Sequence, residues 1–310
     1  MVDGSGLENR RGASPREFES HPLRQRLEQA ANRPSSADAD LQPRPRRQRR
    51  GERRLLLPLV AAFLVVLVGG VWVGFATGRV SFGCAFTPAN RCLRVLFLGN
   101  SYTSVNDLPL TFARLAAAGG WTVETTMVAP GAATLADHAA SSTIAAVLGA
   151  GNGQGPWTAV VLQEQSQIPA IATTRDRDMA PAASALAKRI LLIGARPYLL
   201  QTWAPRDGMP GAGLDYTAMQ DAIDESYRAL AVRTGSGLVP AGEAWKRALA
   251  EAPAIALWAD DGSHPSMAGT YLAACSLYLA LTGSSPVGLS ETAGLDSAVA
   301  AALQGIVAGR

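Results

Sequence analysis

From about residue 93 to its end, the chain alternates short apolar runs with longer amphipathic stretches. The short runs have the length and composition of strands buried on both faces, and the longer stretches repeat apolar residues at helical spacing. The expected strands lie at 93–98, 121–128, 157–162, 196–201 and 237–240. The expected helices lie at 108–118, 134–148, 179–193, 216–234, 266–281 and 295–307. This alternation predicts an α/β domain over 93–310, with a parallel sheet of about five strands between two helix layers.

A different pattern precedes this domain. Leu55–Ala76 contains 22 residues without a charged side chain, and as a helix it spans roughly 33 Å, close to the hydrocarbon thickness of a bilayer. The run predicts one transmembrane helix, with a linker over 77–92. A cleaved signal peptide is the alternative, because Gly74 and Ala76 resemble a cleavage site, but 54 residues are long for the part of a leader before its apolar run.

Composition separates the first 54 residues from the rest. They hold 13 Arg and 8 Asp or Glu, and Phe18 is their only aromatic residue. Such a segment buries too little apolar surface to offset its chain entropy, so 1–54 is expected to be a disordered Arg-rich tail. The remaining residues hold 15 basic and 17 acidic side chains, with no basic excess that would suggest nucleic acid as a partner.

The arginines also indicate an orientation for the transmembrane helix. Seven of them lie in Arg44–Arg54, directly before the apolar run, and only Arg79 follows closely after it. The positive-inside rule then places the N-terminus in the cytoplasm and the α/β domain outside it. A nucleic-acid role for the tail is the competing interpretation, and it predicts steeply salt-dependent binding.

Three cysteines are too few for a disulfide scaffold. Cys84 and Cys92 lie eight residues apart before the first strand and can pair in an oxidising compartment, with two free thiols as the alternative. Cys275 lies in an apolar helical stretch and is expected to be a buried small side chain.

Open parallel sheets form their sites at the carboxyl ends of the strands, so reactive side chains are expected there. The first expected strand runs into Gly99-Asn100-Ser101, which places Ser101 near the start of a helix at that edge. A serine hydroxyl is a weak nucleophile, so it needs a base and a group that orients the base. A turn or cap serine is the competing interpretation of Ser101.

Only three histidines can supply that base. His21 lies in the tail, and His138 lies in an expected helix, where a surface position is anticipated. His264 lies in a turn-rich loop, and Asp261 precedes it by three residues, a spacing that allows the carboxylate to accept from one imidazole nitrogen. Asp260 remains an alternative orienting acid. No metal site is expected, because no other histidine accompanies these side chains.

The serine and histidine blocks together resemble the SGNH/GDSL hydrolase superfamily over about residues 93–283. Gly99-Asn100-Ser101 matches the first block, Gly-Asp-Ser, with Asn in place of Asp, and Asp261 and His264 match the last, Asp-x-x-His. Gly131 stands at the position of the second block. In the third block, Gly-x-Asn-Asp, Gln165 replaces the asparagine.

The resemblance implies a three-layer α/β/α fold and acyl transfer from an ester. Ser101 is then the nucleophile, His264 the general base and Asp261 its orienting acid. The backbone N–H groups of Ser101 and Gly131 and the side-chain amide of Gln165 are expected to form the oxyanion hole. Gln163 is the alternative donor to Gln165, since loss of one donor typically costs about 10²–10³ in rate.

Asn100, Gln163 and Trp203 lie at strand ends and are candidates for the substrate pocket. The leading hypothesis is a membrane-anchored, extracytoplasmic serine esterase without a cofactor. Its location suggests an acylated cell-envelope glycan, such as an O-acetyl ester, as substrate. An O-acyltransferase of the same fold and a non-catalytic module that binds glycans or a partner are the alternatives, and no oligomeric state follows from the sequence.

Overall fold

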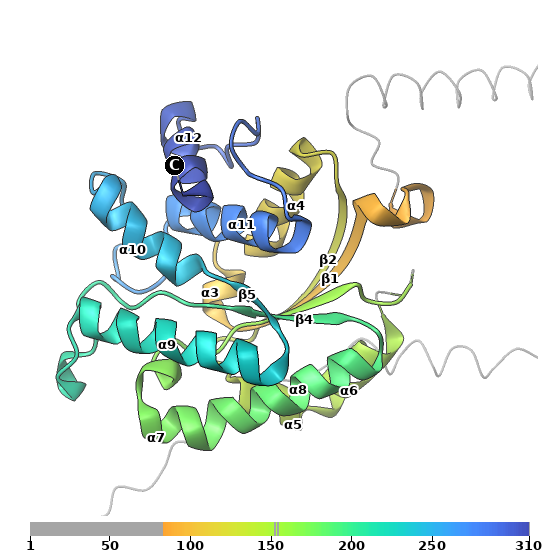
Figure 1. Cartoon of the computed structure of the whole chain (residues 1–310), viewed down its shortest axis with the longest axis horizontal. Helices are drawn as coiled ribbons and strands as arrows, with labels where there is room; N and C mark the ends of the chain where they lie inside the picture. The colour runs from red at the N-terminus through yellow and green to blue at the C-terminus, as the bar shows by residue number, and fades with distance from the viewer. Residues whose placement is uncertain (1–82, 152, 154, 310) are drawn as a thin grey trace, which may run out of the picture. The chain divides into compact units, whose positions relative to one another are not determined.

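The structure is a computed structural model that describes residues 83–151, 153 and 155–309. Its five strands form one parallel sheet in the order β2-β1-β3-β4-β5 (Figure 1). They are β1 (Cys92–Leu98), β2 (Thr122–Val128), β3 (Ala159–Leu162), β4 (Arg196–Leu200) and β5 (Gly237–Val239). The α/β class and the five-stranded parallel sheet predicted from the sequence are confirmed.

Helices cover both faces of this sheet (Figure 1). One face carries α4 (Leu108–Ala118), α10 (Ala241–Glu251), α11 (Met267–Thr282) and α12 (Ser297–Ala308). The other carries α5 (Leu135–Ala140), α6 (Ser142–Ala150), α8 (Ala180–Leu192) and α9 (Tyr216–Thr234). The short elements are η1 (Cys84–Phe86), η2 (Ala89–Arg91), α3 (Ser101–Ser104), η3 (Ile168–Ala170), α7 (Ala172–Thr174), the π-turn η4 (Arg175–Met179) and η5 (Pro210–Ala212).

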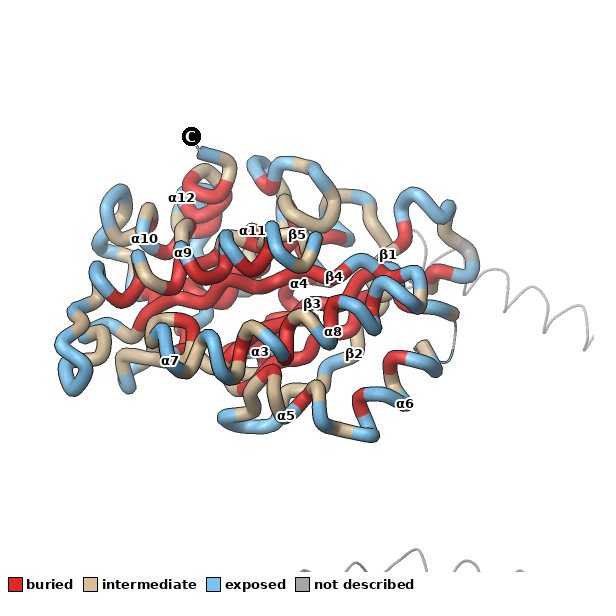
Figure 2. Tube along the Cα trace, turned by 60° about the horizontal axis from the view of Figure 1, so that its bottom comes forward, coloured by how far each residue is buried: buried red, intermediate tan, exposed pale blue. Residues whose placement is uncertain are grey.

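The residues of β1 show why the sheet lies at the centre. Val95 and Phe97 pack into one helix layer, and Leu96 and Leu98 pack into the other. All four side chains are almost completely buried, and the strands appear as the buried middle of the molecule in Figure 2. A strand that is apolar at every position from Val95 onward therefore fits a parallel sheet covered on both faces.

Two elements differ from the sequence prediction. The helix expected over 134–148 is two helices, because Ser141 adopts an extended backbone and caps α6 by accepting from the amide of Ile144. Helix α10 is not predicted at all. Its buried residues Ala241, Ala244, Trp245 and Ala248 recur at helical spacing, so the signal for this helix was present in the sequence.

The predicted tail and transmembrane helix, and the first part of the linker, lie outside the described residues. Within the described part of the chain, no helix combines the length and the apolar character needed to cross a bilayer.

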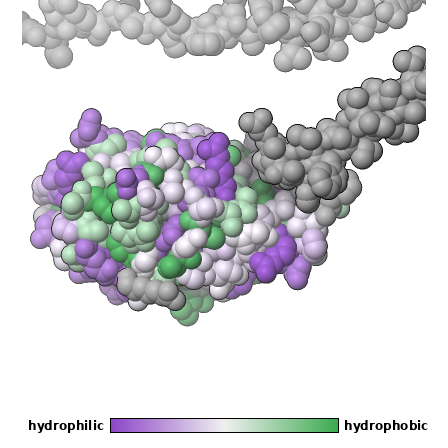
Figure 3. Space-filling model, turned by 90° about the horizontal axis from the view of Figure 1, so that it is seen from above, coloured by the Kyte–Doolittle hydropathy of each residue, from purple (hydrophilic) through white to green (hydrophobic). Residues whose placement is uncertain are grey.

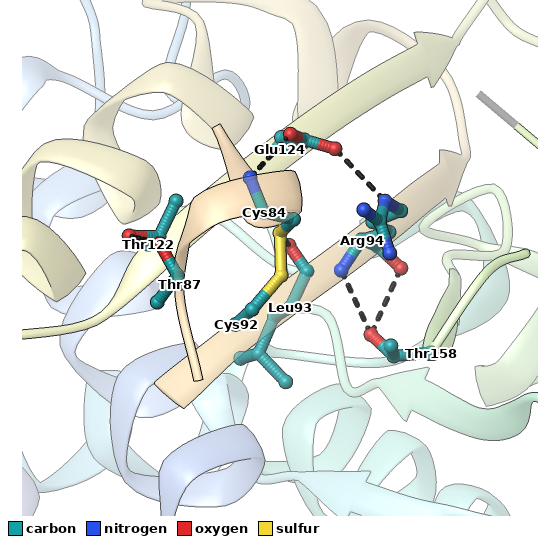
Figure 4. Close-up of a disulfide and its surroundings, with 8 residues drawn as sticks. All are labelled: Cys84, Thr87, Cys92, Leu93, Arg94, Thr122, Glu124 and Thr158. Carbon is teal, nitrogen blue, oxygen red and sulfur yellow. Dashed lines mark hydrogen bonds and ion pairs between the residues drawn. A yellow bond between two sulfur atoms is a disulfide. The ribbon is translucent and has the colours of Figure 1, made fainter. Parts of the chain in front are cut away.

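Cys84 and Cys92 form a disulfide at the start of β1, with their Cα atoms 5.4 Å apart (Figure 4). Glu124 of β2 reinforces this link, because its carboxylate accepts from the amide of Cys84 at 2.7 Å and from Nε of Arg94 at 3.0 Å. The hydroxyl groups of Thr87 and Thr122 lie 2.9 Å apart, within hydrogen-bonding distance. The segment before β1 is therefore tied to both strands at the edge where they begin.

Removing the disulfide by the double substitution C84S/C92S is expected to lower the free energy of unfolding by about 2–3 kcal/mol, the loop-closure entropy of so short a loop. Chemical denaturation followed by circular dichroism measures this change. A reductant is expected to destabilise the wild-type chain by a similar amount and to leave C84S/C92S unaffected. Equal stability of the oxidised and reduced wild-type chains would contradict this account.

Candidate active site

The turn from β1 to α3 presents Ser101 at the carboxyl edge of the sheet. Asn100 caps α3 by accepting from the amide of Tyr102 at 3.1 Å, and Ser101 is the first residue of that helix. Gly99 has no room for a side chain: a Cβ there would lie 2.5 Å from Oγ1 of Thr103 and 2.6 Å from Oε1 of Gln163. The glycine is therefore required by close packing behind the turn.

Ser101, His264 and Asp261 form a continuous chain of hydrogen bonds. Oγ of Ser101 lies 2.9 Å from Nε2 of His264, and Nδ1 of His264 lies 2.5 Å from Oδ2 of Asp261. The other carboxylate oxygen of Asp261 accepts from the amides of Ser263 and His264, each at 2.9 Å. The structure thus brings together the three residues that the first and last sequence blocks identify.

The hydrogen bonds of Asp261 favour its charged form. The hydrogen bond from the imidazole of His264 is the largest of the effects that lower the pKa of this carboxyl to about 2, and the hydrogen bond from the amide of Ser263 lowers it further. An ionised Asp261 accepts a hydrogen bond from Nδ1–H of His264, which leaves Nε2 as the acceptor that faces the hydroxyl of Ser101. Asp260 is exposed, and it is the neighbouring Asp261 that contacts the imidazole.

A stack of aromatic rings supports the loop that carries His264. The ring of Tyr102 stacks on Trp203 at 4.9 Å, and Trp203 stacks on Trp245 at 4.2 Å. The hydroxyl of Tyr102 lies 2.6 Å from Oγ of Ser263, and Nε1 of Trp203 donates to the carbonyl of Ser263 at 3.1 Å. Tyr102, the residue that follows Ser101, therefore also positions the loop that carries His264.

Two further residues, Arg206 and Asn106, hold the same loop. The amide of Arg206 donates to the carbonyl of Gly262 at 2.7 Å, and its guanidinium donates to the carbonyl of Ala259 at 3.1 Å. On the far side of His264, Nδ2 of Asn106 donates to the carbonyl of Pro265 at 2.9 Å. The loop is fixed on both sides of the imidazole, so the geometry facing Ser101 is preorganised.

The three residues predicted to line a substrate pocket lie inside the protein. Asn100, Gln163 and Trp203 are buried, and their polar atoms are used inside the protein. Oε1 of Gln163 accepts from the amide of Asn100 and from Oγ1 of Thr103, and its Nε2 donates to Oδ1 of Asn100. The expectation that they line a pocket is corrected: each side chain points into the core and supports the turn or the loop next to it.

The residues predicted to form the oxyanion hole are placed differently from one another in the structure. Oε1 of Gln165 accepts from the amides of Gln167 and Ile168, so this side chain caps its own turn. Gln163, the alternative donor, is committed to the core. Gly131 lies in an exposed turn with no atom within 4 Å of its Cβ direction, so the space beside it is open. The backbone N–H groups of Ser101 and Gly131 and the side-chain N–H of Gln165 remain the candidates for the oxyanion hole, because the turn of Gln165 uses its Oε1 and not its Nε2.

His138 is a residue whose place differs from the sequence expectation. It is buried on α5, and its Nε2 lies 2.8 Å from the carbonyl oxygen of Gly99, to which it donates. A surface position was expected because the helix pattern does not show what faces it. The carbonyl that it holds precedes Asn100 and Ser101 directly, and Nδ2 of Asn100 donates to Ala133 in the loop before the same helix. His138 therefore positions the turn that carries Ser101.

Glu164 is another buried polar side chain near this edge of the sheet. It is fully buried at the end of β3, where Oε1 accepts from the amides of Leu135 and Gln165 and Oε2 has no hydrogen-bond partner. Burial raises the pKa of this carboxyl to about 7, against the opposing effect of the two amides. Among the described residues, no three His, Cys, Asp or Glu side chains group closely enough to hold a metal ion.

No model of a known protein family matches the sequence, and no curated protein matches it. Solved structures do match. A protein from Slackia heliotrinireducens assigned to the SGNH hydrolases is 29% identical, with a TM-score of 0.52, and the match covers 61% of this chain and 99% of that one. A DUF4886 family protein from Bacteroides uniformis is 20% identical, with a TM-score of 0.60, and the match covers 70% of this chain and 94% of that one.

These similarities agree with the four sequence blocks. The more identical of the two matches is an SGNH hydrolase by its description, and the second shows the same fold. The chain therefore has the fold of the SGNH/GDSL hydrolases, as the order of its blocks predicted.

Proposed function

We propose that the protein is a serine esterase in which Ser101 attacks the carbonyl carbon of a carboxylic ester. The observation that supports this most directly is the hydrogen-bonded chain from Oγ of Ser101 through His264 to Asp261. A serine, an imidazole and a carboxylate in this arrangement are the parts required for nucleophilic acyl transfer.

In the first half of the reaction, Oγ of Ser101 forms a bond to the ester carbon and its proton moves to Nε2 of His264. The imidazolium is stabilised by Asp261, whose low pKa keeps it ionised. The negative charge that develops on the carbonyl oxygen is held by the N–H groups of Ser101 and Gly131. The first residue of a helix has no intrahelical acceptor, so the N–H of Ser101 is available. His264 then returns the proton to the departing alcohol.

In the second half, water attacks the acyl-serine with His264 as its base. The carbonyl–Oγ bond breaks, Ser101 regains its proton and the carboxylic acid leaves. Gln163 donates inside the core, so the side-chain amide of Gln165, whose Oε1 is held by its own turn, is the group that can supply a third donor. Loss of one donor typically costs about 10²–10³ in rate.

The location of the enzyme is part of the proposal. Residues 55–76 anchor the chain in a membrane with the domain outside the cytoplasm, as the arginines before the span suggest. The disulfide between Cys84 and Cys92 supports a domain outside the cytoplasm, because disulfides persist in oxidising compartments. The substrate that fits this location is an acylated envelope glycan with accessible acetyl esters.

Substitution of the proposed nucleophile or base is expected to abolish turnover. S101A and H264A should each lower kcat for a short activated acetyl ester by at least about 10³-fold, because the remaining groups cannot form the acyl-enzyme. The measurement is initial-rate hydrolysis by the full chain in detergent.

Two neighbouring residues give matched controls for that experiment. Ser104 lies in the same short helix and Asp260 in the same loop, so S104A and D260N should keep wild-type rates, while D261N should lose most activity. Turnover that survives S101A would reject the mechanism.

His138 allows a test of positioning. H138A removes the donor to the carbonyl of Gly99 and is expected to lower kcat about 10- to 100-fold with little change in KM, because the turn that carries Ser101 relaxes. H138Q can restore an N–H near the same point and should recover most of the rate. A parallel loss in H138A and H138Q, or a change in KM alone, would contradict this role.

Glu164 predicts a pH dependence of stability. Because its pKa is raised from 4.5 to about 7 in the folded chain, the folded state holds the proton more tightly. The stability is then complete below pH 4.5 and falls by up to about 3 kcal/mol as the pH rises to 7 and beyond. E164Q should flatten this profile in chemical denaturation, whereas E251Q, at an exposed position, should keep it. An unchanged slope in E164Q would disprove the assignment.

A further inference from the structure

The three most exposed large hydrophobic side chains of the described residues lie at the ends of two neighbouring helices. Leu191 and Leu192 end α8 and are 52% and 77% exposed, and Val232 in the last turn of α9 is 86% exposed. The other large hydrophobic side chains classed as exposed reach only 37–42%. On the face seen in Figure 3, by contrast, hydrophilic and hydrophobic side chains are interspersed. Such a concentration on two packed helices indicates a surface with a partner.

Basic side chains accompany these apolar ones. A shallow groove of 390 Å³ lies between the ends of α8 and α9, and Lys188 and Arg233 line it together with Leu191 and Leu192. No acidic residue lines this groove. Lys188 and Arg233 are both exposed. The surface is therefore apolar and cationic, the combination that suits the headgroup and acyl boundary of an anionic membrane.

The C-terminal ends of α8 and α9 lie at the edge of the sheet where the strands begin. The segments that lead into β2, β3, β4 and β5 contain no Asp or Glu; they are 119–121, 151–158, 193–195 and 235–236. At the opposite edge, the irregular segments after β1, β3 and β4 carry Asp107, Glu164, Asp207 and Asp215 and one basic residue, Arg206. The loop between α10 and α11, which carries His264, adds Asp260 and Asp261. Charge thus separates the amino edge from the catalytic edge.

The chain also enters the domain at the amino edge. The described residues start at Gly83, and the disulfide from Cys84 to Cys92 fixes this point at the first residue of β1 (Figure 4). Only six residues separate Gly83 from the end of the apolar run at Ala76, and six residues reach at most roughly 20 Å. A bilayer that holds the apolar run therefore lies close to this edge.

We propose that the ends of α8 and α9 dock on the membrane surface, with Leu191, Leu192 and Val232 in the lipid interface and Lys188 and Arg233 on anionic phospholipid headgroups. This inference rests on the proposed membrane anchor. It also sets the direction of the active site, because Ser101 follows the far end of β1, a strand of seven residues, roughly 23 Å long. The site then faces away from the bilayer, toward esters on polymers outside the membrane.

The test uses the full chain in vesicles of mixed phosphatidylglycerol and phosphatidylcholine whose acyl chains carry nitroxide quenchers. A fluorescent dye is attached through L192C, or through D207C at the catalytic edge as the control position. Cys275 is buried and the other two cysteines are paired, so the introduced thiol is the one that reacts. We expect strong quenching and a blue-shifted emission at position 192, and neither at position 207.

A charge variant sharpens the test. K188E/R233E should lose more than half of the quenching at position 192, as should vesicles of phosphatidylcholine alone. The matched variant R114E/R177E makes the same change in charge at exposed arginines outside the groove and should keep it. Unchanged thermal unfolding of both variants shows that the fold is intact.

The outcomes separate the two proposals. If alkaline carbonate releases the chain from vesicles, the anchor itself fails. If the chain stays in the membrane but the dyes at 192 and 207 are quenched equally weakly, the docking surface is rejected. Shielding of position 192 that depends on protein concentration in detergent, without quenching by lipid, would assign this face to a second copy of the chain and overturn the proposal.

Discussion

The candidate active site depends on one buried side chain, Gln163 at the end of β3. Its amide accepts from the backbone and side chain of the turn after β1 and donates back to Asn100, with all of these groups shielded from water. Buried polar networks of this kind are rigid when every group is paired and costly when one is lost. Gly99 makes the network possible, because any Cβ there would collide with it. Strand β3 thereby holds the residue that follows β1 in place.

Other supports of Ser101 are arranged around this network. His138 reaches it from α5 and holds the carbonyl of Gly99, while Tyr102 and Trp203 connect it to the loop of His264. Ser101 and His264 are therefore positioned by a shared set of contacts even though they lie 163 residues apart in the chain. This explains how a serine and a histidine from opposite ends of the domain meet at 2.9 Å.

The alternation of apolar runs and helices was enough to predict the class and the five strands, because burial on both faces of a parallel sheet leaves a strong signal. The order of the blocks was enough to identify Ser101, Asp261 and His264 as residues that meet. The roles of Gln163, Gln165 and His138 could not be predicted, because they depend on which side chain faces which backbone group. Gln165 folds onto its own turn, and His138 meets β1 only once α5 packs against it. Spacing along the sequence carries no information on such contacts.

The reactivity of Ser101 tests the central claim most directly. A fluorophosphonate carries a phosphorus centre that an activated serine attacks with loss of fluoride, which leaves a stable adduct of known mass on Oγ. After brief exposure of the folded full chain, we predict one adduct on the peptide that contains Ser101, and none in H264A or in heat-denatured wild type. An unmodified Ser101, or an adduct on another residue with Ser101 intact, would contradict the account.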